Sequence, residues 1–184
     1  MTDKIDQIEK IITATLKLAE TKPWSEITME NIANVAKIKP ALLMKHVSSK
    51  LSILDAFNRQ LDNQTHQYFR HIPDQGSIRD QLFDILMARF DALQIHKPSL
   101  NQIFKMTVPF DPIASACGLK SLIISMQSIL ELMGTNTHSP IGIIKAKVLS
   151  TIFFRSFLVW LKDDSIDMAM TMAKLNQDLT TIET

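Results

Sequence analysis

The segment of residues 28–57 constrains the fold of this chain more than any other stretch, because it holds two short helical patterns separated by a tight turn. Thr28 is suited to cap the first helix, whose apolar side chains recur at helical spacing. These side chains are Met29, Ile32, Ala33, Val35 and Ala36. The second helix begins at Pro40, whose fixed φ angle suits a first helical position, and extends to about His46. Two such helices share one small core and leave a face of the second uncovered.

A third, much longer helix follows this pair. Ser48 is predicted to cap it, and its first apolar residues recur at three-residue steps as Leu51, Leu54 and Phe57. The pattern continues to Tyr68 and Phe69 and stops before Pro73. A helix over residues 48–71 is too long to serve a small domain alone, so we expect a second core to share it.

Helical patterns account for the rest of the chain as well. They predict helices over residues 5–19, 77–96, 98–107, 112–133, 140–161 and 165–181, with a turn at residues 73–77 and with Trp24 and Ile27 filling the small core. The predicted helix starts are Ser77 paired with Asp80, Asp111 before Pro112, Ser139 before Pro140, and Asp164. Residues 141–161 are expected to be buried on most sides. Only four glycines are present, so the sequence predicts an all-α fold of about nine helices.

The segment TMENIANVAKIKPALLMKHVSSKLSILDAF resembles the DNA-binding segment of the TetR family of bacterial transcriptional regulators. The matching residues are Thr28, Ile32, Ala33, Ala36, Ile38, Leu43, His46, Lys50 and Leu54. Five residues depart from the family pattern: Lys37 stands for the turn glycine, Lys39 for a capping Ser, Met44 for a phosphate-contacting Tyr, Val47 for Phe, and Leu51 for an acidic residue. The first three lie on the DNA-facing side.

The resemblance implies a two-domain organisation. Residues 1–50 would form a three-helix helix-turn-helix domain that continues into the shared helix 48–71, and residues 51–184 would form a larger helical domain for effector binding and dimerisation. The DNA-binding residues it implies are Thr28, Lys37, Lys39, Pro40, Ala41, Leu42, Met44, Lys45, His46 and Lys50.

Charge is concentrated on the same segment, although the whole chain carries only +1. Between Lys37 and Lys50 there are four lysines, one histidine and no acidic residue. Contacts to phosphates supply most sequence-independent affinity for DNA, which favours a nucleic-acid partner. The alternative is a lysine face that is merely solvated.

The C-terminal domain offers two further sets of candidate residues. The effector pocket is assigned to Phe83, Met87, Phe90, Phe104, Met106 and Met126, because Met and Phe line adaptable apolar cavities; ordinary core packing is the alternative. The homodimer interface is assigned to Ile152, Phe153, Val159, Trp160, Met168, Met172, Leu175 and Leu179. Packing of both faces within one subunit is the alternative.

Catalytic and metal-binding signatures are not found in the sequence. His66 and His71 are five residues apart, which misses the spacing of two ligands on one helix face, and the single Cys117 excludes an intramolecular disulfide. We therefore expect no enzyme, no cofactor and no metal site. The apolar run 141–161 is interrupted by Lys145, Lys147 and Arg155, so we expect no membrane span and a cytoplasmic protein.

These observations predict a dimeric DNA-binding transcriptional regulator, a repressor, that binds operator DNA and is released by a small hydrophobic effector. Two alternatives stay open at this point. One is a lipid- or isoprenoid-binding accessory protein on a TetR-like scaffold, similar to those of ubiquinone biosynthesis. The other is a protein-interaction module that retains a vestigial helix-turn-helix.

Overall fold

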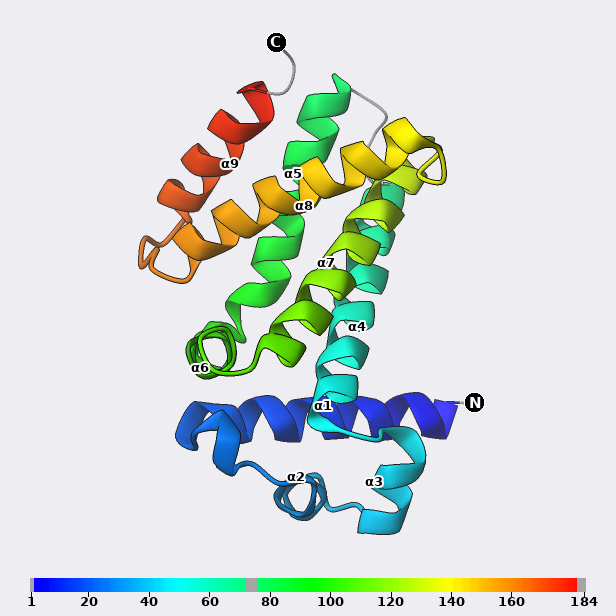
Figure 1. Ribbon diagram of the computed structural model, residues 1–184, viewed down its shortest axis with the longest axis vertical. Coiled ribbons are helices and arrows are strands. Elements are labelled where there is room, and N and C mark those ends of the chain that lie inside the picture. The colour runs from blue at the N-terminus through cyan, green and yellow to red at the C-terminus, as the bar shows by residue number, and fades with distance from the viewer. Residues whose placement is uncertain (1, 72–75, 182–184) are drawn as a thin grey trace. The chain divides into compact units, whose positions relative to one another are not determined.

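A computed structural model describes residues 2–71 and 76–181 of the chain (Figure 1). Within these residues there are nine α-helices, one short 3₁₀ helix (η1) and no strand. The elements are α1 (Thr2–Thr21), η1 (Trp24–Glu26), α2 (Met29–Ala36), α3 (Pro40–His46), α4 (Lys50–His71), α5 (Ile78–Gln94), α6 (Lys97–Thr107), α7 (Pro112–Leu132), α8 (Pro140–Trp160) and α9 (Ala169–Thr181). The predicted all-α fold of about nine helices is confirmed. Most of the predicted turn at 73–77 lies outside the described residues.

The chain divides into two compact units. Unit 1 comprises Met1–Gln60 and His96–Ser121, and unit 2 comprises Leu61–Ile95 and Leu122–Thr184. Helices α4 and α7 each contribute residues to both units. The division differs from the predicted boundary near residue 50, because α6 packs against α1 and η1 and so belongs with the N-terminal helices.

Unit 1 is built around the apolar face of α1. Ile11, Ile12 and Leu16 are buried on that face. Trp24 and Ile27, in the connection that follows α1, are buried as well and fill the small core as predicted. Helices α2 and α3 pack on this core, which fixes the position of the helix-turn-helix relative to α1.

The structure corrects two predicted helix caps. At α4 the cap is Ser49 and not Ser48, because the Ser49 Oγ accepts the backbone N–H of Ser52 at 3.2 Å. At the last helix the Asp163 carboxylate accepts the N–H and the hydroxyl of Thr171, and α9 begins at Ala169 and not at residue 165, so Asp164 does not stand directly before it. A sequence pattern locates a helix end to within a few residues, and hydrogen bonds decide the rest.

Other predicted caps are confirmed by their hydrogen bonds. Ser77 and Asp80 form a capping box at the start of α5. The Asp111 carboxylate accepts the backbone N–H of Ala114 at 2.8 Å in the first turn of α7. Ser139 accepts the N–H of Gly142 at 3.0 Å at the start of α8.

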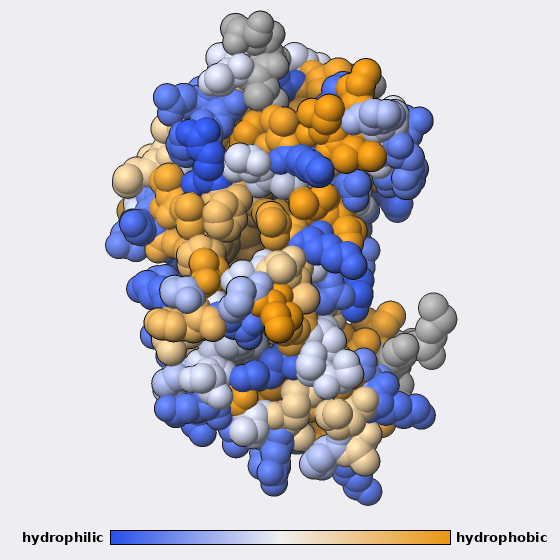
Figure 2. All heavy atoms as spheres, in the orientation of Figure 1, coloured by the Kyte–Doolittle hydropathy of each residue, from blue (hydrophilic) through white to orange (hydrophobic). Residues whose placement is uncertain are grey.

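Unit 2 corrects the prediction that residues 141–161 are buried on most sides. In α8, Ile141 is 68% exposed and Ile144 is 61% exposed. Val148 and Leu158 are also exposed. Ile141, Ile144 and Val148 follow at three- and four-residue steps, and Leu158 lies about four turns after Ile144 on the same side of the helix. Figure 2 shows hydrophobic side chains along the visible face of α8. An uncovered apolar stripe on a long helix indicates a surface that binds a partner.

Helix α7 is the one helix in the described part of the chain that is long and apolar enough to cross a membrane by length and composition. Helices that belong to the core of water-soluble proteins pass the same test, so this feature is weak evidence for a span. In the sequence, the apolar run that was considered for a membrane span is residues 141–161, in α8.

Candidate nucleic-acid interface

The turn between α2 and α3 is held by local hydrogen bonds and a left-handed residue. Thr28 caps α2: its Oγ1 accepts the backbone N–H of Asn31 at 3.1 Å, and its own N–H donates to the Asn31 side chain at 3.2 Å. Lys37 ends α2 with φ 55° and ψ 41°, and its N–H donates to the carbonyl of Asn34 at 3.2 Å. This conformation favours glycine, which explains why a glycine is usual at this position.

Helix α3 has one buried side and one uncovered side. Leu43 is fully buried, and Val47 directly after the helix is buried too, so both anchor α3 to the core of unit 1. The predicted DNA-facing residues on the other side are exposed in the structure. They are Lys39, Pro40, Ala41, Met44 and Lys45, and Leu42 is half-buried beside them. The helix therefore presents two lysines and three small or apolar side chains to solvent.

Two of the predicted DNA-binding residues contact other parts of unit 1. The His46 Nε2 lies 2.7 Å from the side-chain oxygen of Gln7 on α1. The Lys50 Nζ donates to the Trp24 carbonyl at 2.5 Å and lies 4.8 Å from the centroid of the Trp24 ring. Burial lowers the pKa of Lys50. Both side chains thus tie α3 and α4 to the core, a role that the sequence did not predict.

Two hollows lie on unit 1, and only one of them is next to α3. A cavity of about 240 Å³ is lined by Met44, Lys45, Ser48, Ser52 and Arg59, with Ile8, His46, Val47 and Ala56. Its rim combines Lys45 and Arg59, which is itself paired with Asp55 at 2.5 Å, with the first turn of α4, whose backbone N–H groups favour anions. This cavity is large enough for a phosphate group.

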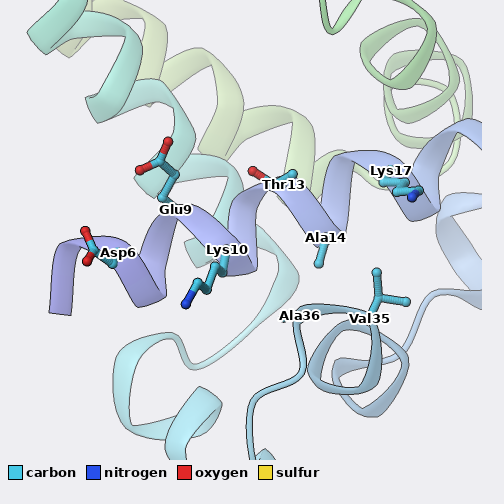
Figure 3. A pocket seen from close by; sticks show the side chains of 8 residues that line it. All are labelled: Asp6, Glu9, Lys10, Thr13, Ala14, Lys17, Val35 and Ala36. Carbon is cyan, nitrogen blue, oxygen red and sulfur yellow. The ribbon is translucent and has the colours of Figure 1, made fainter. Parts of the chain in front are cut away.

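The larger hollow, of about 550 Å³, lies between α1 and α2 (Figure 3). Ala14 and Val35 line its apolar wall, and Asp6, Glu9, Lys10 and Lys17 of α1 line the remainder together with Thr13 and Ala36. Its charged residues are of both signs, so it offers no preference for a polyanion. None of the predicted effector-pocket residues lines either hollow.

The six predicted pocket residues are divided between the units. Phe83, Met87, Phe90 and Met126 belong to unit 2, and Phe90 and Met126 are fully buried there. Phe104 and Met106 belong to α6, which is part of unit 1. The structure therefore does not bring the six together within one unit, because α6 packs against α1 and η1.

Most residues assigned to the dimer interface are core residues. The buried members are Ile152, Phe153, Trp160, Met168, Leu175 and Leu179, whereas Val159 is half-buried and Met172 is exposed. The six buried side chains are not available to a second subunit, whereas other apolar residues of the same helices are exposed. The exposed apolar residues on the same helices are Ile141, Ile143, Ile144, Val148, Phe154, Leu158, Met170 and Met172.

Sequence reasoning also missed an ion pair in the interior of unit 2. Arg89 of α5 is 2% exposed, and its guanidinium donates to the Asp62 carboxylate of α4 at 2.6 Å. A signal was present in the sequence, because Arg89 recurs at helical spacing among apolar residues of α5. No cluster of three potential metal ligands is found among the described residues.

The fold resembles known structures along nearly its whole length. A TetR transcriptional regulator from Nitrosomonas europaea superposes with a TM-score of 0.75 at 16% identity, covering 95% of this chain and 96% of that one. A TetR transcriptional regulator from Rhodococcus sp. RHA1 gives 0.70 at 16% identity, covering 98% and 97%. A TetR-family repressor from Thermus thermophilus, FadR, solved in complex with lauroyl-CoA, gives 0.62 at 18% identity, covering 94% and 93%.

The sequence itself matches no protein-family model. It also matches no curated protein. At identities this low the structural likeness establishes the fold, and the chain has the fold of TetR-family transcriptional regulators. The resemblance predicted from residues 28–57 is confirmed at that level.

Proposed function

We propose that this protein is a dimeric DNA-binding transcriptional regulator of the TetR type that represses transcription and is released from DNA by a small hydrophobic effector. The observation that carries the proposal is the orientation of α3. Leu43 and Val47 anchor it, so that Lys39 and Lys45 are turned toward solvent on a fold shared with TetR-family regulators. A helix held in this way can enter the major groove of DNA.

The uncovered side of α3 is suited to binding DNA in general more than to recognising one particular base sequence. Lys39 and Lys45 can donate to phosphates or to guanine, and Ala41 and Met44 can contact thymine methyl groups. Ser48 and Arg59, in the hollow beside α3, would hold a backbone phosphate. We expect affinity to depend strongly on salt, because most of these contacts neutralise phosphates.

Dimerisation is supported by the uncovered apolar stripe of α8 and its charges. Helix α8 carries Lys145, Lys147 and Arg155 and no acidic residue. Asp164 and Asp167 are exposed in the segment that follows its other end. When two copies of α8 pack antiparallel about a two-fold axis, the lysines of one copy meet the aspartates of the other, so the surface is complementary to itself.

A dimer would place two copies of α3 at the spacing that DNA binding requires. Two copies of α3 must lie about 34 Å apart, one turn of the DNA duplex, to enter successive major grooves. An effector that changes this spacing would release the protein from DNA. The FadR structure, with its bound lauroyl-CoA, supports a hydrophobic effector for this fold.

The experiment is a titration of fluorescent DNA from upstream of the protein's own gene with the purified protein, followed by anisotropy at increasing salt. The proposal expects a saturable complex with one dimer per site and a steep loss of affinity with salt. Absence of binding, combined with binding to liposomes, would replace the proposal by the lipid-binding alternative.

A further inference from the structure

The interior of unit 2 contains a charged pair that packing alone does not require. Arg89 and Asp62 join α5 to α4 at 2.6 Å, and the Ser125 hydroxyl of α7 donates to the same carboxylate oxygen. Burial lowers the pKa of the Arg89 guanidinium, and the nearby Asp62 carboxylate raises it by less. Apolar side chains of the same volume often stabilise a protein as well as a buried ion pair does.

An aromatic cluster lies on one side of the guanidinium. The Arg89 Cζ lies 5.7 Å from the centroid of the Phe153 ring, and Phe153 stacks on Phe90 at 4.8 Å. Phe90 also lies 6.1 Å from Trp160, which is fully buried. A guanidinium pairs with carboxylates and stacks on aromatic rings, and ligand sites combine apolar walls with a few such polar groups.

A second polar group in the same region lacks a partner. The Ser156 side chain is fully buried, and its Oγ has no hydrogen-bond partner among the described residues. Ser156 follows Phe153 by three residues and precedes Trp160 by four, so the three side chains share one face of α8. A buried hydroxyl that makes no hydrogen bond is unfavourable unless another molecule supplies one.

We propose that unit 2 binds an apolar monocarboxylate whose carboxylate replaces Asp62 on Arg89 and accepts a hydrogen bond from Ser156. The hydrogen bond from Arg89 to Asp62 shows that the guanidinium binds a carboxylate at this position. The exchange adds one negative charge to the site, because Asp62 stays in the chain as the ligand carboxylate arrives; the Asp62 side chain is 16% exposed, so it can turn toward solvent. A phosphate dianion would add two negative charges, which is less favourable still in a buried site.

The exchange would couple binding to α4. Asp62 lies on α4, and α4 begins four residues after α3 ends. When a ligand takes over Arg89, α4 loses its ion pair with α5, and this is the step by which the ligand would act on DNA binding. In that respect the inference rests on the proposed function, whereas binding of the carboxylate itself does not.

The test compares matched ligands on the unmodified protein by titration calorimetry. Octanoate and 4-phenylbutyrate are the carboxylate probes, and octanol and 4-phenylbutanol have the same apolar bodies without the charge. At least one carboxylate is expected to bind about tenfold or more tightly than its alcohol, as a charge-assisted hydrogen bond to a buried arginine requires. Failure of both carboxylates to bind, or equal affinity for acid and alcohol, overturns the proposal.

Three variants locate the site. Arg89→Met is expected to abolish the preference for the acid, and Ser156→Ala to weaken acid binding about threefold to tenfold. Arg70→Met, the same change at an exposed arginine of α4, is the control and is expected to change nothing. If Arg89→Met does not fold, Asp62→Asn decides, because removing the internal competitor should tighten octanoate binding about tenfold. Unchanged or weaker binding by Asp62→Asn overturns the proposal.

DNA titrations of the same preparations separate this inference from the proposed function. If the protein binds DNA but no carboxylate, the proposed regulator function stands and the proposed carboxylate site is wrong. Protein that binds carboxylates but no DNA retains the site and loses the regulator function.

Discussion

Helices α3 and α8 both leave side chains uncovered, but with opposite chemistry. On α3 the uncovered residues include Lys39 and Lys45, and the apolar Leu43 faces inward. On α8 the uncovered residues include Ile144 and Val148, although the helix also buries a full apolar face. The first surface suits a hydrated polyanion, and the second suits another apolar surface.

The difference between α3 and α8 shows how well helical periodicity predicts which side chains of a helix are exposed. In α3, Lys45 lies on the side away from the buried Leu43, so the pattern alone assigns it to solvent, whereas His46 contacts Gln7 of α1. In α8 apolar residues occur on all sides, so the pattern does not tell which of them pack within the chain. Packing against the other helices decides which apolar residues of α8 are covered. It buries six of the eight residues that were predicted for the dimer interface.

The largest effect is expected from a charge placed in the α8 stripe. Val148→Glu would bury an unpaired carboxylate in the proposed dimer interface and weaken dimerisation about 100-fold. Because each operator would be read by two copies of α3, DNA binding should fall with it. Analytical ultracentrifugation measures the dimer, and anisotropy measures the DNA complex.

A matched control exists in unit 1. Val108→Glu makes the same substitution at a valine of similar exposure outside α8 and should leave the dimer intact. If both variants remain dimeric and folded by circular dichroism, α8 is not the interface and the comparison between the two helices fails.

The next effect is expected on α3. Lys39→Ala combined with Lys45→Ala should weaken DNA binding by about tenfold or more, and it should lower the slope of log affinity against log salt by about 2. Each lysine contributes several-fold by itself. Lys105→Ala with Lys162→Ala removes the same charge from exposed lysines elsewhere and should change binding little. If the two double variants lost the same affinity for DNA, binding would depend on net charge and not on α3.

The fold and the position of helix α3 could be predicted from the sequence because their signals are local. Thr28, Pro40 and Leu43 mark a cap, a helix start and an anchor by type and spacing. The exposed stripe of α8 and the Arg89–Asp62 pair depend on contacts between helices far apart in sequence. Periodicity gives a face to each helix but does not say which helix covers it, so these features required the structure.

A smaller effect is expected at Asp163, which organises the start of α9. Its buried carboxylate accepts the N–H and hydroxyl of both Ser165 and Thr171. Burial raises the pKa of Asp163, but these hydrogen bonds outweigh it and lower the pKa from 3.8 to about 2. Since the folded pKa lies below the unfolded one, the stabilisation is present above about pH 4 and is lost as pH falls toward about 2.

Asp163→Asn should therefore lower the free energy of unfolding by about 2 kcal/mol at neutral pH and flatten its pH dependence between pH 4 and 2. Urea titrations at several pH values measure both. Asp167→Asn, an exposed carboxylate of the same segment, is the control. A variant that keeps the full acid dependence of the natural protein would assign the acid sensitivity to other carboxylates.

The smallest effect, and the one that separates fold from binding most cleanly, is expected at Lys37. Its φ of 55° places an L-residue with a side chain in the left-handed region, at a cost of about 1 kcal/mol relative to glycine. Lys37→Gly should raise the melting temperature by about 2–4 °C. Lys37→Ala removes the same charge but retains a Cβ, so it should not raise the melting temperature. If both variants weaken DNA binding equally while only glycine stabilises, Lys37 acts on DNA through its charge and on the turn through its backbone.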